Sequence, residues 1–100
     1  MLTRNVNPII PVALTLTRNG AEPVKFNVNF RNMRTSEVQA MFADESLTLA
    51  DVVLRLVDSW ETEFPLDAEG LKDMEDIHPG LAKGILSAFG DARQVAVEKN

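Results

Sequence analysis

Few side chains in this sequence could do chemistry, and the single histidine, His78, is the first to consider. It follows Asp73, Glu75 and Asp76, so one imidazole nitrogen and several carboxylate oxygens could together bind a divalent metal ion. Transition-metal sites usually use more nitrogen or sulfur ligands than this segment offers. The spacing also lacks the central glycine and the terminal glutamate of a calcium-binding loop. The pattern therefore favours a polar junction between two helices, with a solvated histidine and no metal.

A second set of acidic side chains lies in the middle of the chain. Two such carboxylates can act as the general acid and the general base of a hydrolase. The first three of them surround two aromatic residues in a segment that leaves a predicted helix, which favours an acidic rim exposed to solvent. The members of this set are Asp58, Glu61, Glu63, Asp67 and Glu69.

Nucleophilic and phosphate-binding chemistry has no clear carrier in the sequence. The chain contains no cysteine and no tyrosine, and its serines share one histidine. Neither a nucleophile elbow nor a glycine-rich phosphate loop occurs. We therefore predict a protein that is not an enzyme and uses no cofactor. An enzyme would require Glu61, Asp67 and His78 to converge in one pocket.

The composition is typical of one small globular domain. The chain has 100 residues, 45% hydrophobic and 25% charged, so residues 1–100 are expected to fold as a single domain. Asp and Glu number 15 against 10 Lys and Arg, and this net charge of −5 argues against nucleic-acid binding. We find neither an apolar run long enough to span a membrane nor a secretory signal. These features predict a cytoplasmic protein that binds neither nucleic acid nor a membrane.

The N-terminal third of the sequence predicts a β-hairpin. Residues 1–11 contain two prolines and are expected to form an irregular arm. Alternating apolar and polar side chains then predict two antiparallel strands within residues 12–31. The Asn19-Gly20 pair favours the chain reversal, and Pro23 predicts a connecting loop longer than two residues.

The following segments show the periodicity of helices. Ser36 and Gln39 fit a capping box at the start of a short helix that buries Phe42. Thr48 is the expected N-cap of the next helix, whose apolar stripe continues to Trp60.

Two more helices are predicted in the C-terminal third. Asp67 is the expected N-cap of a helix that ends near Ile77, and Pro79 suits the first turn of the last helix. With residues 36–100 as the helical part, the sequence predicts an α+β fold, in which an N-terminal antiparallel β-hairpin packs on a bundle of about four helices. The apolar face of the last helix comprises Leu81, Ile85, Phe89, Ala92 and Ala96.

Trp60 and Phe64 form the most prominent pair of apolar side chains. Large aromatic residues beside a loop anchor either the core of the protein or an interface with a partner. Trp60 lies on a helical stripe, which favours the core, whereas Phe64 fits either position.

A specific order of features runs through residues 52–100. A helix ends in Trp60 among acidic neighbours, Phe64 follows, and Asp67-Ala68-Glu69-Gly70-Leu71 begins another helix. The later features are Ile77-His78-Pro79-Gly80-Leu81-Ala82, Ile85, Phe89, Ala92-Arg93 and the ending Glu98-Lys99-Asn100. In this order, and with a hairpin before it, the chain resembles the tail assembly chaperones of long-tailed bacteriophages, although an aromatic residue often stands at the position of His78.

The resemblance implies a non-catalytic protein that binds the tape-measure protein, a long, hydrophobic and helix-rich chain. It also implies help in recruiting tail-tube subunits, in the cytoplasm of the bacterial host, and a longer form of the chain made by frameshifting. Self-association stays open. Pro79 and Gly80 mark a structural junction beside the expected binding surface. The candidate protein-binding residues are Trp60, Phe64, Leu66, Leu81 and Phe89.

Two further functions stay open. A small DNA-binding regulator or antitoxin would use residues 79–98 as its recognition helix, with Lys83, Arg93 and Lys99 on the phosphates. These cations are sparse and mixed with acidic residues, which disfavours that function. A structural tail-completion protein would remain in the finished virion.

Overall fold

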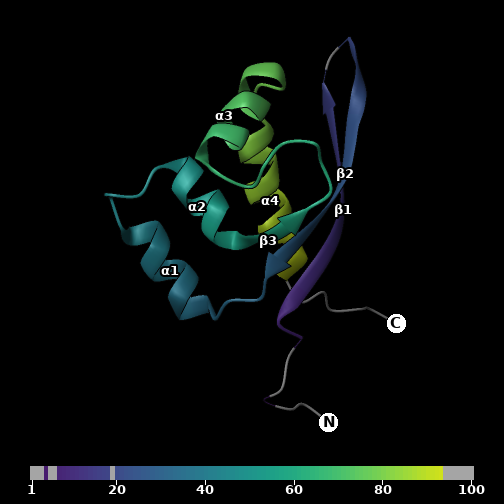
Figure 1. Ribbon diagram of the computed structural model, residues 1–100. Helices are drawn as coiled ribbons and strands as arrows, with labels where there is room; N and C mark the ends of the chain where they lie inside the picture. Colours follow the sequence, from purple (N-terminus) through teal and green to yellow (C-terminus); the bar gives the residue numbers. More distant parts are fainter. Residues whose placement is uncertain (1–3, 5–6, 19, 94–100) are drawn as a thin grey trace.

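A three-stranded antiparallel sheet and four helices beside it make up the computed structural model of this chain (Figure 1), which describes residues 4, 7–18 and 20–93. The strands lie in the order β1-β2-β3, and the helices lie on one side of the sheet. The α+β prediction is therefore confirmed, with one strand more than the predicted hairpin. In chain order the elements are β1 (Ile9–Arg18), β2 (Ala21–Arg31), α1 (Thr35–Ala43), α2 (Leu49–Leu56), β3 (Val57–Trp60), α3 (Ala68–Ile77) and α4 (Leu81–Arg93).

Strand β1 begins at Ile9, so the prediction of an irregular arm over residues 1–11 was wrong at its C-terminal end. Pro11 is tolerated because of where its backbone points. The carbonyl of Asn27 in β2 accepts a hydrogen bond from the N–H of Glu61 at 2.9 Å, so the backbone groups of Asn27 point toward β3. Those of Asn29, two residues further along β2, point the same way. Pro11 pairs with Asn29 and therefore faces the outer edge of β1, where a missing N–H breaks no bond of the sheet.

The hairpin turn is tighter than predicted. Arg18 pairs with Ala21, which leaves Asn19 and Gly20 as the whole connection, and Asn19 lies outside the described residues. Gly20 has a φ of +73°, a conformation that glycine adopts without strain. Pro23 lies inside β2, at a shift of the register where the strand bulges. A proline is acceptable at such a bulge, so it does not lengthen the loop.

The predicted long helix ends early and gives way to a third strand. Helix α2 stops at Leu56, and Val57 has extended backbone angles, with φ −91° and ψ 123°. Ser59 of β3 accepts a side-chain hydrogen bond from Asn29 of β2 at 3.0 Å. The helical assignment of Trp60 was therefore wrong. The free edge of β2 supplies hydrogen bonds that compete with helix continuation, and β-branched and aromatic residues favour the extended form.

The predicted N-terminal caps of the first two helices differ in outcome. At α1 the box of Ser36 and Gln39 is not formed; instead the carboxylate of Glu37 accepts a hydrogen bond from the N–H of Arg34 at 3.3 Å. At α2 the predicted N-cap is confirmed, because Thr48 Oγ1 accepts a hydrogen bond from the N–H of Asp51 at 3.2 Å. The Asp51 carboxylate also accepts from the N–H of Thr48 at 3.0 Å, which completes a capping box that was not predicted.

The two C-terminal helices meet at a turn. Asp67 caps α3, as predicted, by accepting a hydrogen bond from the N–H of Gly70 at 2.7 Å. Pro79 precedes α4 instead of occupying its first turn. The carbonyl of His78 accepts from the N–H of Leu81 at 3.1 Å, and Gly80 has a φ of +90°, as in a type II turn with proline before glycine.

The core lies between the helix-facing side of the sheet and helices α2, α3 and α4. Phe30 of β2 and Phe89 of α4 meet edge to face, with ring centroids 5.4 Å apart. This arrangement suits the quadrupoles of the two rings. The largest side chains of the core that are completely buried are Phe30, Leu56, Met74, Ile85, Val28, Val53 and Val57.

Gly70 allows the first turn of α3 to pack closely on the preceding loop. A Cβ atom at this position would overlap the carbonyl oxygen of Pro65. We expect Gly70→Ala to lower the free energy of unfolding by about 2 kcal/mol, because backbone has to move to make room. Chemical denaturation followed by circular dichroism measures this change.

Gly90 of α4 is the matched control. A Cβ there would meet no atom within 4 Å, so Gly90→Ala is expected to raise the free energy of unfolding by up to about 1 kcal/mol, the ordinary gain in helix propensity. Equal effects of the two substitutions would contradict the close approach at Pro65.

Candidate functional site

The end of β3 and the loop that follows it hold three of the predicted binding residues. Trp60 Nε1 donates a hydrogen bond to the carbonyl of Phe64 at 2.9 Å, and Thr62 Oγ1 accepts from the N–H of Phe64 at 3.1 Å. Trp60, Phe64 and Leu66 are half-buried and pack against the core. The hydrogen bond of the Trp60 indole thus holds the loop in place. Part of each of the three apolar side chains stays at the surface.

The other two predicted binding residues lie in the core. Leu81 is 2% exposed and Phe89 is 3% exposed, so neither can contact another protein while the fold is intact. Their proposed place on a binding surface is therefore corrected: both belong to the inward face of α4, which packs on the sheet and on the other helices. The spacing of apolar residues in a helix shows which side chains share a face. It does not show whether that face packs in the core or binds a partner.

A shallow hollow of about 210 Å³ lies beside Phe64. Its apolar wall includes Phe26 of β2, Phe64 and Met74 of α3, and its polar wall includes Glu61 and His78. The structure thus brings together two members of the hypothetical catalytic set, while the third, Asp67, caps α3. Glu61 accepts a hydrogen bond from Asn27 at 3.0 Å on the exposed side of the sheet.

The acidic segment around His78 serves to build a helix end. The Glu75 carboxylate accepts hydrogen bonds from the N–H groups of Gly80 and Ala82, at 2.8 and 3.0 Å. These bonds, first that of Ala82 and then that of Gly80, lower the pKa of Glu75. The Nδ1 atom of His78 is buried without a hydrogen-bond partner among the described residues. Within the same residues, no three His, Asp or Glu side chains gather closely enough to hold a metal ion.

One of the three cations of the hypothetical DNA-binding helix is engaged within the fold. The guanidinium of Arg93 lies 5.6 Å from the centre of the Phe89 ring, and its Nη2 donates to Thr35 Oγ1 at 3.4 Å. Lys83 is exposed on α4, and Lys99 lies outside the described residues. The predicted row of phosphate contacts therefore has Lys83 as its one free member among the residues that the structure describes.

An apolar groove between α2 and α3 was missed from the sequence. It encloses about 290 Å³, and Leu49, Ala50 and Leu71 are among its apolar lining residues. Its charged lining residues are Lys72, Glu75 and Asp76. Leu49 is 38% exposed. We call this feature the α2–α3 groove. In the sequence Leu49 falls on the same apolar stripe as Val52 and Val53, which are buried, so the stripe alone does not reveal that Leu49 is exposed.

Two other large apolar side chains are exposed on helices. Phe42 of α1 is 53% exposed, contrary to its expected burial, whereas the neighbouring Met41 is 6% exposed and belongs to the core. Ile77, at the end of α3, is 59% exposed. Single exposed apolar side chains are common on soluble proteins, and neither of these two lines the α2–α3 groove.

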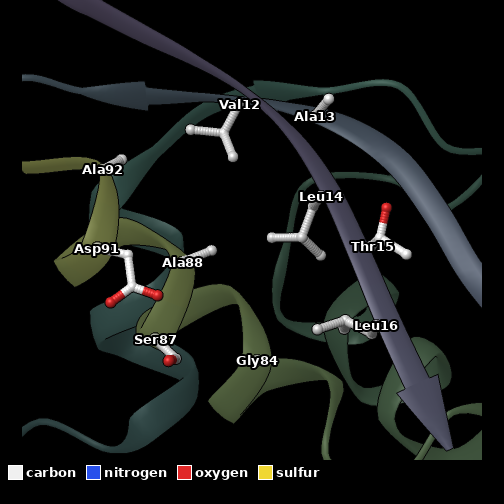
Figure 2. A pocket seen from close by; sticks show the side chains of 10 residues that line it. All are labelled: Val12, Ala13, Leu14, Thr15, Leu16, Gly84, Ser87, Ala88, Asp91 and Ala92. Atoms are coloured by element: carbon white, nitrogen blue, oxygen red, sulfur yellow. The ribbon is translucent and has the colours of Figure 1, made fainter.

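A larger groove, of about 490 Å³, lies between the outer edge of β1 and one face of α4 (Figure 2). Its two walls are a run of strand residues centred on Leu14 and a row of small helix residues that includes Gly84, Ala88 and Ala92. We call it the β1–α4 groove. Of the residues that line it, Asp91 alone is charged.

No helix in the part of the chain that the structure describes has the length and apolar character needed to cross a bilayer.

Comparison with known proteins identifies one family. The family model described as phage tail assembly chaperone matches residues 4–100, almost the whole chain. No curated protein and no solved structure shows significant similarity to this chain.

The cap formed by Glu75 predicts a pH-dependent stability. Because hydrogen bonds to the ionised form lower its pKa below the ordinary 4.5, the cap stabilises the fold above that pH and is lost as the pH falls. We expect Glu75→Gln to lower the free energy of unfolding by about 1 kcal/mol at pH 7, a typical cost of losing a helix cap. The deficit should shrink below pH 4.5.

Glu63→Gln is the control, since Glu63 is exposed in the loop before α3. Its free energy of unfolding should match that of the parent protein at both pH values. A Glu75→Gln deficit that stays constant down to pH 3, within about 0.3 kcal/mol, would contradict the cap.

Proposed function

The chain belongs to the phage tail assembly chaperones, and on this premise we propose that it binds the tape-measure protein without catalysis. In the same proposal it helps to recruit tail-tube subunits around that protein in the host cytoplasm. A tape-measure chain exposes apolar helix faces before assembly, and such faces aggregate unless they are covered. The chaperone would cover them until the tube subunits take over.

The observation that carries the proposal is the α2–α3 groove. It is open and largely apolar, and Leu49 stands at its surface with more than a third of its side chain exposed. An amphipathic helix binds in such a groove by placing its apolar face on the floor and its polar face toward the rim. The charged side chains of Lys72, Glu75 and Asp76 lie along the α3 wall, where the polar face of a bound helix would meet them.

The charge of the chain supports the same role. A net charge of −5 on 100 residues keeps a complex with a hydrophobic client dispersed. One shallow groove per copy gives moderate affinity, which permits release when tube subunits arrive, and several copies along one client would add their effects. Phe64, beside its own hollow, is a second candidate contact, and the half-buried Trp60 and Leu66 of the same segment are further candidates.

We also propose that a longer form of the chain, made by frameshifting, has two parts with different binding partners. In this proposal the chain described here contributes the client-binding part, and the added segment contacts tail-tube subunits. The roles of DNA-binding regulator and tail-completion protein predict different behaviour. The first predicts salt-dependent binding to duplex DNA, and the second predicts the protein in purified virions.

Leu49→Ser tests the α2–α3 groove. We expect it to weaken binding of the tape-measure protein by about tenfold, because a partly exposed leucine that becomes buried contributes between 1 and 2 kcal/mol. Co-expression with the tape-measure protein, followed by measurement of its soluble fraction and of the dissociation constant, gives the result.

Phe42→Ser is the matched control, since it also removes a large exposed apolar side chain but lies outside the groove. It should leave the dissociation constant unchanged within a factor of about two. If Phe42→Ser weakens binding of the tape-measure protein more than Leu49→Ser does, with both variants folded, the α2–α3 groove is not the binding site. If Leu49→Ser and Phe64→Ala both bind as tightly as the parent protein, neither residue is a contact.

A further inference from the structure

The outer edge of β1 is an unpaired strand edge that lies beside the β1–α4 groove. The hydrogen bonds between β2 and β3 determine which backbone groups of β1 point toward its outer edge. Because Asn27 and Asn29 turn toward β3, their partners in β1 turn away from β2. The N–H and C=O groups of Ala13 and the corresponding groups of Thr15 therefore face outward, and both residues line the groove.

The edge has few of the features by which proteins prevent strand pairing. From Ile9 to Thr17 it contains no charged residue, and Pro11 is the one position that offers no donor. Exposed edges without charges, bulges or cover are ready templates for another strand. Among the described residues no strand pairs with this edge, since β1 is the first strand in the sheet order.

The groove beside the edge is lined by small side chains. Figure 2 shows Val12, Leu14 and Leu16 projecting from β1 toward α4, while Thr15 points away. Below them, Gly84, Ala88 and Ala92 follow one face of α4 at steps of four residues, and at Gly84 the approach is so close that a Cβ would lie 2.6 Å from Leu16 Cδ2. When a strand is added to a sheet edge, pockets beside the edge accept its alternate side chains.

The two walls of the groove have a common centre. Leu14 is the middle residue of the strand wall, with Val12 and Leu16 on either side. Ala88 is the middle of the small residues on the helix wall. Helix α4 runs antiparallel to β1, because Gly84 lies against Leu16 and Ala92 lies near Val12 (Figure 2). In an isologous interface the same patch of two copies meets about a twofold axis, and antiparallel pairing centred on Leu14 would place Val12 of one copy opposite Leu16 of the other.

We propose that this face binds a second copy of the same chain, with the two β1 strands paired antiparallel about Leu14. Ala13 of each copy then exchanges hydrogen bonds with Thr15 of the other, and Leu14 lies opposite Leu14. The two three-stranded sheets become one six-stranded sheet, and Val12 of each copy lies opposite Leu16 of the other, so that the two grooves adjoin. The occupied edge no longer templates aggregation.

The distribution of charge makes the β1–α4 groove the surface on which two copies of this acidic chain repel each other least. With a net charge of −5, most faces would repel an identical molecule. The β1–α4 groove has Asp91 as its one charged lining residue. In the antiparallel arrangement, Asp91 of one copy lies toward Gly84 of the other, so the two carboxylates stand at opposite ends of the interface. A helical client, in contrast, would leave the strand edge without hydrogen-bond partners.

The proposal is tested by the mass of the full chain in solution. Sedimentation equilibrium should show concentration-dependent doubling of the 11.1 kDa mass. Thr15→Pro should weaken the dimer by at least about tenfold, because it removes an outward N–H and inserts a ring between the strands. The substitution should leave the monomer folded, as Pro11 already occupies an equivalent position on the same edge. Thr15→Val retains the N–H and is the matched control; its dimer should persist.

A cysteine pair tests the register independently, because the chain has no cysteine of its own. In the proposed pairing, positions 13 and 15 of the two copies lie about 5.5 Å apart at Cα, within the range of a disulfide. Mild oxidation of the double variant Ala13→Cys, Thr15→Cys should give a covalent dimer, and the single variant Thr15→Cys should not. A chain that stays monomeric up to about 1 mM, a dimer that survives Thr15→Pro, or a double variant that does not cross-link overturns the proposal.

Discussion

The contact between the rings of Phe30 and Phe89 connects the central strand of the sheet to the last helix of the chain, and both grooves depend on it. A two-stranded hairpin is at best marginally stable in water, so its apolar face needs a cover. Each buried ring contributes about 2 kcal/mol through loss of water-exposed apolar surface. With α4 fixed on β2, the edge of β1 lies beside α4, and the helices that pack on α4 form the α2–α3 groove.

The polar side chains that could have suggested catalysis mostly complete the ends of helices. Asp67 and Thr48 accept hydrogen bonds from free N–H groups at the starts of α3 and α2, and Glu75 does so for the turn before α4. The hydrogen bonds from Ala82 and Gly80 lower the pKa of Glu75, so this carboxylate stabilises a fixed backbone and is poorly suited to take up a proton at neutral pH. The surface then offers shallow apolar grooves with charged rims, which suits reversible binding of another chain.

The sequence predicted elements whose signals are local and missed those that depend on the tertiary structure. Side-chain alternation predicts the hairpin, and the caps at Thr48 and Asp67 are single-residue signals with a direct hydrogen-bond cause. Strand β3 was missed because the spacing of Val57 and Trp60 also fits a helix, and the free edge of β2 decides between the two. The periodicity of α4 likewise cannot distinguish Phe89 as a core residue from Phe89 as a contact, and exposure of Leu49 follows only from helix packing.

Hydrogen–deuterium exchange of the chain, alone and in complex with the tape-measure protein, tests the central claim most directly. The account predicts slower amide exchange in the complex over α2 and α3, on both walls of the groove, with β2 unchanged because its amides already bond within the sheet. A complex that forms without any added protection in these two helices would contradict the account, as would a folded chain that does not bind the tape-measure protein at all.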